Sequence, residues 1–277
     1  MKFLFLRVKA ISNLAKILIL VLLGFIVFYC QSQAKVASPM KILLPLYSYP
    51  NWYQSENYLW SKVASAGKEV KIEAIINPHN GPDAQPPNQD YQRGLQDLRA
   101  SDITILGYVS TRYGDRPIDQ VKQDIDLYDN FYDLDGIFLD ESASDLKQLS
   151  YYQDIYRYIK TTTNYEQVVI NPGTHTDEAY LSRPAADTAV IFEDYSAAWS
   201  NYQAQSYQNR YKSKHFASLI HSVPDVQTMK SYIDLAVARN IGYIYITDDS
   251  PDSDDSNPWN SLPSYWQEEV EYIQALK

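Results

Sequence analysis

The sequence predicts an α/β protein that folds as a single (β/α)8 barrel of the TIM type. Eight short apolar runs recur along residues 39–277, stretches with helical spacing separate them, and no linker, repeat or low-complexity tract divides this part of the chain. Each parallel strand of a barrel needs a crossover helix, and eight such units need about 250 residues. The length therefore fits one barrel domain over residues 39–277.

The expected strands are short apolar runs rich in β-forming residues. In chain order they are Lys41–Tyr47, Val70–Ile76, Ile103–Val109, Gly136–Leu139, Val168–Ile170, Thr188–Phe192, Phe216–Ile220 and Gly242–Ile246. Between them, apolar residues recur at helical spacing, most clearly over Asp119–Phe131, Asp145–Thr161, Val226–Ala238 and Ser264–Leu276. An open doubly wound sheet is the alternative, but such sheets usually carry a glycine-rich phosphate loop, and neither GxGxxG nor GxxxxGK occurs.

Residues 1–34 have the pattern of a signal peptide. Four basic side chains precede an apolar stretch over residues 17–29, and Ser32 and Ala34 are small residues where a signal peptidase cuts. The apolar stretch is short for a membrane span. We expect cleavage near Ala34 and a protein that is secreted or located in the periplasm or cell envelope, without stable membrane insertion. An uncleaved N-terminal anchor is the alternative.

The net charge and the cysteine, tyrosine and tryptophan counts indicate which kinds of partner and chemistry this chain can have. Residues 1–34 carry four basic and no acidic side chains, so their removal changes the net charge from −10 to about −14. This charge argues against nucleic acid or anionic lipid as a partner and is compatible with a cationic or neutral polymer. Cys30, the only cysteine, lies in the same segment, so we expect neither disulfides nor a thiol nucleophile. The 25 Tyr and 5 Trp suit sugar rings as well as ordinary packing.

Polar and aromatic residues follow every expected strand. The C-terminal ends of barrel strands all meet at one end of the barrel, where ligands bind. The residues expected there are Tyr47 and Tyr49; Asn77, His79 and Asn80; Tyr108, Thr111 and Tyr113; Asp140 and Glu141; Asn171; Glu193 and Asp194; His221; and Asp248 and Asp249. Any one of them could instead cap a helix or form a turn.

Two of these strands end in adjacent carboxylates, which is typical of glycosidases. Cleavage of a glycosidic bond needs one carboxyl to protonate the leaving oxygen and a second to attack or to activate water. The fourth and sixth strands are neither adjacent nor opposite in a barrel, so Asp140 and Glu193 should face each other across the cleft. We assign Asp140 as the nucleophile and Glu193 as the general acid/base. Glu141 should point away from the axis, as a rim support or a subsite contact, if the strand stays regular.

No other catalytic pattern is present. The four histidines are scattered and no HExxH occurs, which argues against a zinc site, and no GxSxG elbow supports a serine esterase. The aspartate-rich segment 248–255 lacks the glycine and terminal glutamate of an EF-hand loop. We expect no metal and no cofactor.

Six ordered motifs identify a family resemblance. They are PLYSYP (45–50), INPHNGP (76–82), GYVSTRYGDR (107–116), DGIFLDE (135–141), NPGT (171–174) and FED (192–194). Together they resemble the spherulin-4-like proteins, also called spherulation-specific family 4. The resemblance implies a secreted (β/α)8 glycoside hydrolase that cuts α-1,4-linked galactosamine or N-acetylgalactosamine polymers. It places Asp140 and Glu193 at the nucleophile and acid/base positions. The segment DYSAAW (194–199) matches no family motif, which leaves substrate choice less defined than reaction type.

We therefore expect an endo-α-1,4-galactosaminidase-like hydrolase that acts on an amino-sugar exopolysaccharide, with retention of configuration; the residues alone leave inversion and exo action open. Its expected substrate contacts are Tyr47, Tyr49, Asn77, Asn80, Tyr108, Thr111, Tyr113, Glu141, Asn171, Asp194 and Asp248. The rival interpretation is a non-catalytic carbohydrate-binding barrel of the cell envelope or matrix. A metal-dependent polysaccharide deacetylase is a third, weaker one.

Overall fold

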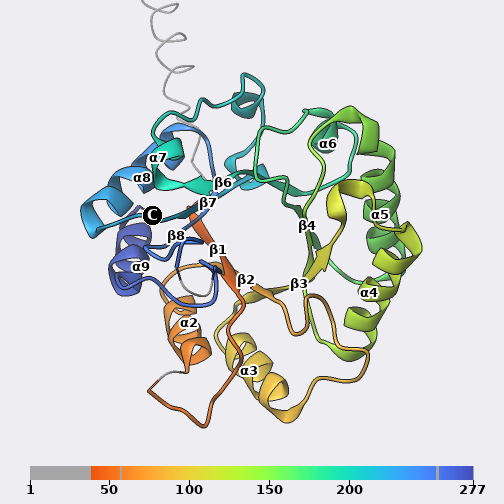
Figure 1. The fold of residues 1–277 in the computed structure, drawn as a ribbon, viewed down its shortest axis with the longest axis horizontal. Helices are drawn as coiled ribbons and strands as arrows, with labels where there is room; N and C mark the ends of the chain where they lie inside the picture. The colour runs from red at the N-terminus through yellow and green to blue at the C-terminus, as the bar shows by residue number, and fades with distance from the viewer. Residues whose placement is uncertain (1–38, 57, 254–255, 277) are drawn as a thin grey trace, which may run out of the picture. The chain divides into compact units, whose positions relative to one another are not determined.

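The computed structural model describes residues 39–56, 58–253 and 256–276. Eight parallel strands form a closed barrel in which each strand pairs with its neighbours in chain order and β8 pairs with β1 (Figure 1). The strands are β1 (Lys41–Leu46), β2 (Ile72–Ile76), β3 (Thr104–Ser110), β4 (Gly136–Asp140), β5 (Gln167–Ile170), β6 (Thr188–Tyr195), β7 (Phe216–His221) and β8 (Tyr243–Ile246). The predicted fold class is confirmed.

Helices surround the barrel (Figure 1). The longer ones are α2 (Leu59–Gly67), α3 (Gln89–Arg99), α4 (Ile118–Phe131), α5 (Leu149–Thr162), α8 (Val226–Ala238) and α9 (Trp266–Ala275). The connections after β5 and β6 contain only the one-turn helices α6 (Ala179–Ser182) and α7 (Ser196–Trp199). Single-turn 3-10 helices span Arg112–Gly114, Leu146–Gln148, Gln208–Arg210 and Ser213–His215.

Most predicted strands agree with the structure to within two residues, but β6 is three residues longer than expected. Its register against β7 shifts between Val190 and Phe192, which marks a β-bulge. Beyond the bulge, Glu193, Asp194 and Tyr195 still pair with β7. A bulge bends its strand and redirects the side chains that follow it, so β6 carries two carboxylates past the apolar core.

Along each strand, successive side chains point alternately to the inside and the outside of the barrel. Tyr108 pairs with Phe138, and Ser110 pairs with Asp140, so the side chains of each pair leave the sheet on the same side. At the opposite end of the barrel, the buried Glu73 carboxylate accepts hydrogen bonds from Tyr243 Oη at 2.6 Å and Lys41 Nζ at 3.3 Å. The Glu73 carboxylate thus has its own partners at the N-terminal end, and Ser110 and Asp140 lie at the C-terminal end of the strands.

The signal segment expected over residues 1–34 lies outside the described residues. Within the described part of the chain, no helix combines the length and apolar character needed to cross a membrane.

Candidate active site

One amide group connects the two predicted catalytic acids. Asn171 Nδ2 donates hydrogen bonds to Asp140 Oδ1 at 2.8 Å and to Glu193 Oε2 at 2.5 Å. The two carboxylate oxygens are therefore separated by no more than the sum of these distances. The structure brings Asp140, Glu193 and Asn171 together at the C-terminal ends of β4, β6 and the intervening β5.

The backbone of the loop after β5 fixes this arrangement. Asn171 N–H donates to the Leu139 carbonyl of β4 at 2.8 Å, and Glu193 N–H donates to the Gly173 carbonyl at 2.9 Å. The loop is therefore bonded to both acid-bearing strands. Asn171 Oδ1 is buried without a hydrogen-bond partner among the described residues. Only the amide nitrogen suits the position between two carboxylates, since an oxygen there would repel them.

The environment of Glu193 favours its protonated form. Burial, followed by the nearby Asp140 charge, raises the pKa of Glu193 from 4.5 to about 7, although hydrogen bonds from Asn171 and Trp259 oppose this rise. A carboxyl group with a pKa near neutrality can donate a proton and later take it back. Glu193 therefore has the properties that a general acid/base requires.

Asp140 has a more polar environment. Burial raises the pKa of Asp140, and hydrogen bonds from the Glu141 backbone, Tyr108 and Asn171 act in the opposite direction. These donors stabilise the ionised carboxylate. Burial raises the pKa of Tyr47 well above its ordinary value, and Asp140 and Glu193 contribute to the rise. Tyr47 and Tyr108 therefore remain protonated hydrogen-bond donors beside the acids, with ring centroids 5.8 Å apart.

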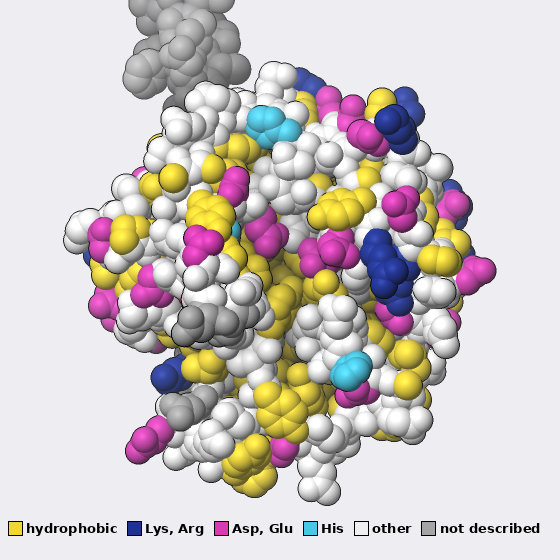
Figure 2. Space-filling view, in the orientation of Figure 1, with side chains coloured by type: hydrophobic (Ala, Val, Ile, Leu, Met, Phe, Trp, Pro, Cys, Tyr) yellow, Lys and Arg dark blue, Asp and Glu magenta, His cyan; other side chains and the backbone are white. Residues whose placement is uncertain are grey.

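The acids open into a cavity of about 350 Å³. Figure 2 shows acidic side chains clustered at the centre of this face, above a hollow lined by hydrophobic side chains. Burial lowers the pKa of His221, which keeps its imidazole neutral at neutral pH. Among the described residues no lysine or arginine lines this cavity, so its ionised carboxylates make the local potential negative. The lining residues are Tyr113, Asp140, Glu141, Asn171, Pro172, Gly173, Glu193, Asp194 and His221.

The expectation that Glu141 points away from the axis is wrong. The strand does not stay regular, because β4 ends at Asp140 and Glu141 adopts a left-handed backbone conformation with φ 49°. This conformation turns its carboxylate back to the cavity, where Ser110 Oγ donates to Glu141 Oε2 at 2.5 Å. Glu141 therefore lies beside Asp140 rather than behind it.

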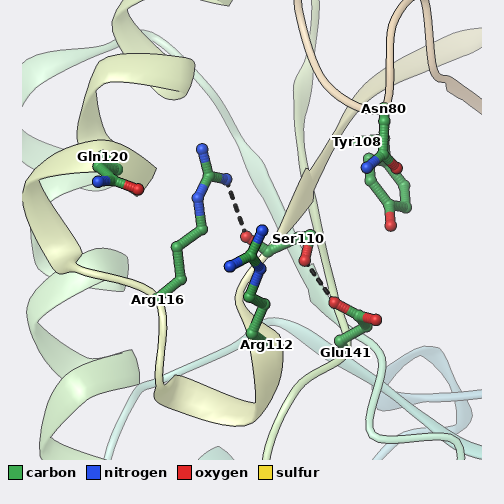
Figure 3. Close-up of a pocket in the computed structure, with 7 residues that line it drawn as sticks. All are labelled: Asn80, Tyr108, Ser110, Arg112, Arg116, Gln120 and Glu141. Carbon is green, nitrogen blue, oxygen red and sulfur yellow. Dashed lines mark hydrogen bonds between the residues drawn. The ribbon is translucent and has the colours of Figure 1, made fainter.

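A second cavity of about 440 Å³ shares Glu141 with the first. Figure 3 shows Arg112 and Arg116 entering it from one side and Asn80 and Tyr108 from the other. Arg116 is neutralised by Asp124 at 2.7 Å and donates to the Ser110 carbonyl at 3.0 Å. Arg112 has a left-handed backbone with φ 48°, and strained residues of this kind concentrate at ligand sites.

The cavities continue on the other side of the acids. A cavity of about 330 Å³ shares Tyr113 and Pro172 with the acidic one, and a further cavity of about 470 Å³ shares Ser144, Asp145 and Lys147 with that. Because each cavity shares lining residues with the next, the four cavities lie side by side on this face. The acids therefore lie within an extended groove rather than at the bottom of a closed pocket.

The remaining predicted contacts divide into two groups. Asn80, Tyr108 and Tyr113 line the groove, whereas Tyr49 is exposed and donates a hydrogen bond to Asp90 outside the cavity linings. Three others hold loops together. Thr111 is fully buried and donates to the Asp140 and Glu141 carbonyls, Asn77 Oδ1 accepts from Gly81 N–H at 2.8 Å, and Asp248 accepts from Ser264 N–H at 3.1 Å. We correct the expected substrate contact of Thr111 to a positioning role, because its side chain is inaccessible.

Sequence reasoning missed Ser110, Arg112, Arg116 and Trp259. Ser110 could have been found, since it is the register partner of Asp140. Trp259 could not, because it lies in an irregular segment after β8 whose path no local pattern predicts.

The side chains that could bind a metal ion do not cluster in the described part of the chain. Across residues 39–56, 58–253 and 256–276, no cluster of three or more His, Cys, Asp or Glu side chains has the arrangement of a metal site. Two aspartates of segment 248–255, at positions 254 and 255, lie outside the described residues.

Comparisons with known proteins give the family. The model of spherulation-specific family 4 matches residues 41–273. The chain belongs to this family. Spherulin-4 of Physarum polycephalum is 35% identical over 259 residues, covering 90% of this chain and 74% of that protein.

Solved structures agree with this membership. The crystal structure of Aspergillus clavatus Sph3, in complex with GalNAc, superposes with a TM-score of 0.71 and 27% identity, covering 85% of this chain and 98% of that one. An endo-1,4-β-mannanase from Rhizomucor miehei shares the barrel fold with a TM-score of 0.55 at 11% identity, covering 87% and 96% of the two chains.

Proposed function

We propose that this spherulation-specific family 4 member is a secreted glycoside hydrolase that cleaves α-1,4-linked galactosamine and N-acetylgalactosamine polymers with retention of configuration. The observation that carries the proposal is the shared Asn171 donor, which holds Asp140 and Glu193 close together. Carboxyl groups are about 5 to 5.5 Å apart in retaining glycosidases and about 6.5 to 9.5 Å apart in inverting ones. The two oxygens that Asn171 bridges can be no farther apart than its hydrogen bonds of 2.8 and 2.5 Å together allow, and this upper limit supports the shorter class.

The reaction then follows from the two environments. Protonated Glu193 donates its proton to the glycosidic oxygen while Asp140 attacks the anomeric carbon, so the C–O bond breaks and a glycosyl ester forms on Asp140. Glu193, now ionised, takes a proton from water, and the resulting hydroxide displaces the Asp140 carboxylate. The pKa of Glu193, about 7, suits both halves of this cycle.

The acidic cavity supports an amino-sugar substrate. Four carboxyl groups line it without a lysine or arginine, so it favours the ammonium group of deacetylated galactosamine. The GalNAc ligand of Aspergillus clavatus Sph3 supports the same sugar series. The extended groove supports endo action, because a polymer can pass through it on both sides of the acids.

Release of reducing ends tests the proposal. The purified chain is incubated with α-1,4-galactosaminans of graded acetylation, beside the Asp140→Asn and Glu193→Gln variants. We expect oligosaccharide release by the wild type and a loss of at least about 10³-fold in each variant. The exposed Asp119→Asn and Glu268→Gln serve as matched controls with unchanged activity. Binding of the polymer without new reducing ends would identify a carbohydrate-binding barrel instead.

A further inference from the structure

We propose that Tyr49, Trp52 and Tyr53, here termed the aromatic rim, form a second carbohydrate-binding site outside the acidic cavity. The site holds sugar rings of a long polymer chain while another part of that chain occupies the groove. The inference depends on the proposed function only for the class of polymer.

The aromatic rim is unusually exposed for such large side chains. Tyr49, Trp52 and Tyr53 are 45%, 48% and 59% exposed, whereas the other four tryptophans of the chain are at most 9% exposed. Clustered exposed aromatic side chains mark interaction sites. The rim is thus set apart from the aromatic residues that build the core.

Hydrogen bonds hold the exposed rings in fixed orientations. Asp90 accepts from Tyr49 Oη at 2.7 Å through one oxygen and from Trp52 Nε1 at 2.8 Å through the other. Tyr49 also packs edge-on against Tyr91 at 5.6 Å, and Trp52 meets Tyr53 at 6.0 Å with an interplanar angle of 78°. Rings ordered before binding lose less entropy when a ligand arrives. Fixed, exposed ring faces are what a stacked sugar requires.

The backbone beneath the rim is braced as well. Asn51 N–H donates to the Tyr49 carbonyl at 2.8 Å, and Trp52 N–H donates to the Pro50 carbonyl at 2.9 Å. These bonds close two tight turns in succession. The loop therefore presents the rim as a built surface rather than as a flexible tip.

The rim lies on the same face as the acids. The rim belongs to the loop that follows β1. Its partner Asp90 lies in the first turn of α3, directly after the loop that follows β2. Both loops lie at the C-terminal end of the barrel strands. Tyr47, beside the acids, is five residues before Trp52, so their Cα atoms are at most about 18 Å apart. Figure 2 shows hydrophobic side chains extending from the central acids to the lower rim of this face, where the orange loop of Figure 1 ends. One polymer can reach both sites.

The exposed rings of the rim and the polar side chains beside them suit a sugar as the ligand. A sugar ring has an apolar face that stacks on an aromatic ring and hydroxyls that bond to polar neighbours, which Asp90, Asn88 and Gln54 supply here. The net negative charge of the chain disfavours nucleic acid and anionic membranes as occupants. A neutral or cationic polysaccharide meets no such repulsion.

Tryptophan fluorescence provides a direct test. In the Glu193→Gln background, acrylamide quenching reports chiefly on Trp52, because the other indoles are buried. We expect an α-1,4-galactosaminan of at least twelve sugars to lower the quenching constant about twofold or more. The additional change Tyr53→Ala, which leaves the Trp52 reporter in place, should weaken this protection. Quenching that the polymer leaves unchanged would overturn the proposal.

Chain-length dependence gives an independent test in the active protein. The Trp52→Ala/Tyr53→Ala variant should raise KM about tenfold for twelve-sugar chains, with kcat unchanged, and leave three-sugar fragments unaffected. Phe131→Ala, an exposed aromatic at the far end of α4, is the matched control and should change neither constant. An equal loss at every length, no loss at any length, or self-association that disappears in the variant would overturn the rim as a sugar site. A wild type without hydrolysis would overturn the proposed function alone, since the quenching test needs only binding.

Discussion

The backbone N–H of Glu193 donates to the carbonyl of Gly173 at 2.9 Å, so the acid on β6 is held by the loop after β5. Gly173 has φ 64°, and a Cβ added there would lie 3.4 Å from Glu193 Cβ. The left-handed backbone favours glycine, and an added Cβ would lie in van der Waals contact with Glu193. The β5 loop thus carries the donor side chain, the backbone acceptor and the space that Glu193 occupies.

Gly173→Ala should therefore impair the site more than the fold. We expect a loss of about 1 kcal/mol in the free energy of unfolding, because alanine is strained at positive φ. Relaxation of the strained loop, whose Gly173 carbonyl accepts the Glu193 N–H bond, should misplace Glu193 and lower kcat about tenfold or more. Chemical denaturation and steady-state kinetics measure the two effects. A variant with wild-type kcat would show that the Gly173 contact does not position Glu193.

Asn171→Ala removes the donor that both acids share. We expect kcat to fall about 10²-fold, as when a preorganised donor is removed from an active site. The Asn171 hydrogen bonds lower the pKa values of Glu193 and Asp140, so their loss should move both limbs of the pH profile upward. A purely structural asparagine would lower activity without moving the profile. Rates measured from pH 4 to 9 distinguish these outcomes.

The wild-type pH profile should be bell-shaped. Activity requires Asp140 ionised and Glu193 protonated, so the rate rises as Asp140 loses its proton and falls above a pH of about 7, where Glu193 ionises. Because the acids interact, the two limbs report the pair rather than either residue alone. Activity that keeps rising through pH 8 would contradict the assignment of Glu193 as the acid.

Glu193 should also make stability depend on pH. Its folded pKa, about 7, exceeds its ordinary value of 4.5, so the folded state binds the proton more tightly and stability falls as pH rises from 4.5 to 7. Glu193→Gln removes this loss. We expect the variant to be about 3 kcal/mol more stable than the wild type at pH 8 and nearly equal at pH 4. Thermal unfolding at the two pH values measures the difference. A variant that is less stable at pH 8 would indicate that the enclosed carboxylate has more favourable partners than those described.

The sequence predicted the barrel because strand and helix periodicities are local, and each strand run was bounded by residues that interrupt it. It also predicted that Asp140 and Glu193 meet, since barrel closure brings strand ends together. It did not predict the orientation of Glu141, which depends on a left-handed residue that tertiary contacts impose. Nor did it predict Trp259, whose position follows from the packing of a long irregular loop, or the bulge that extends β6.

The anomeric form of the first product tests the central claim most directly. Time-resolved proton NMR follows the cleavage of an α-1,4-linked galactosaminan before mutarotation equilibrates the anomers. If Asp140 and Glu193 act as nucleophile and acid/base at their short separation, the α anomer appears first, and neither Asp140→Asn nor Glu193→Gln produces it. A β anomer appearing first, or an α product that persists in both variants, would contradict the account.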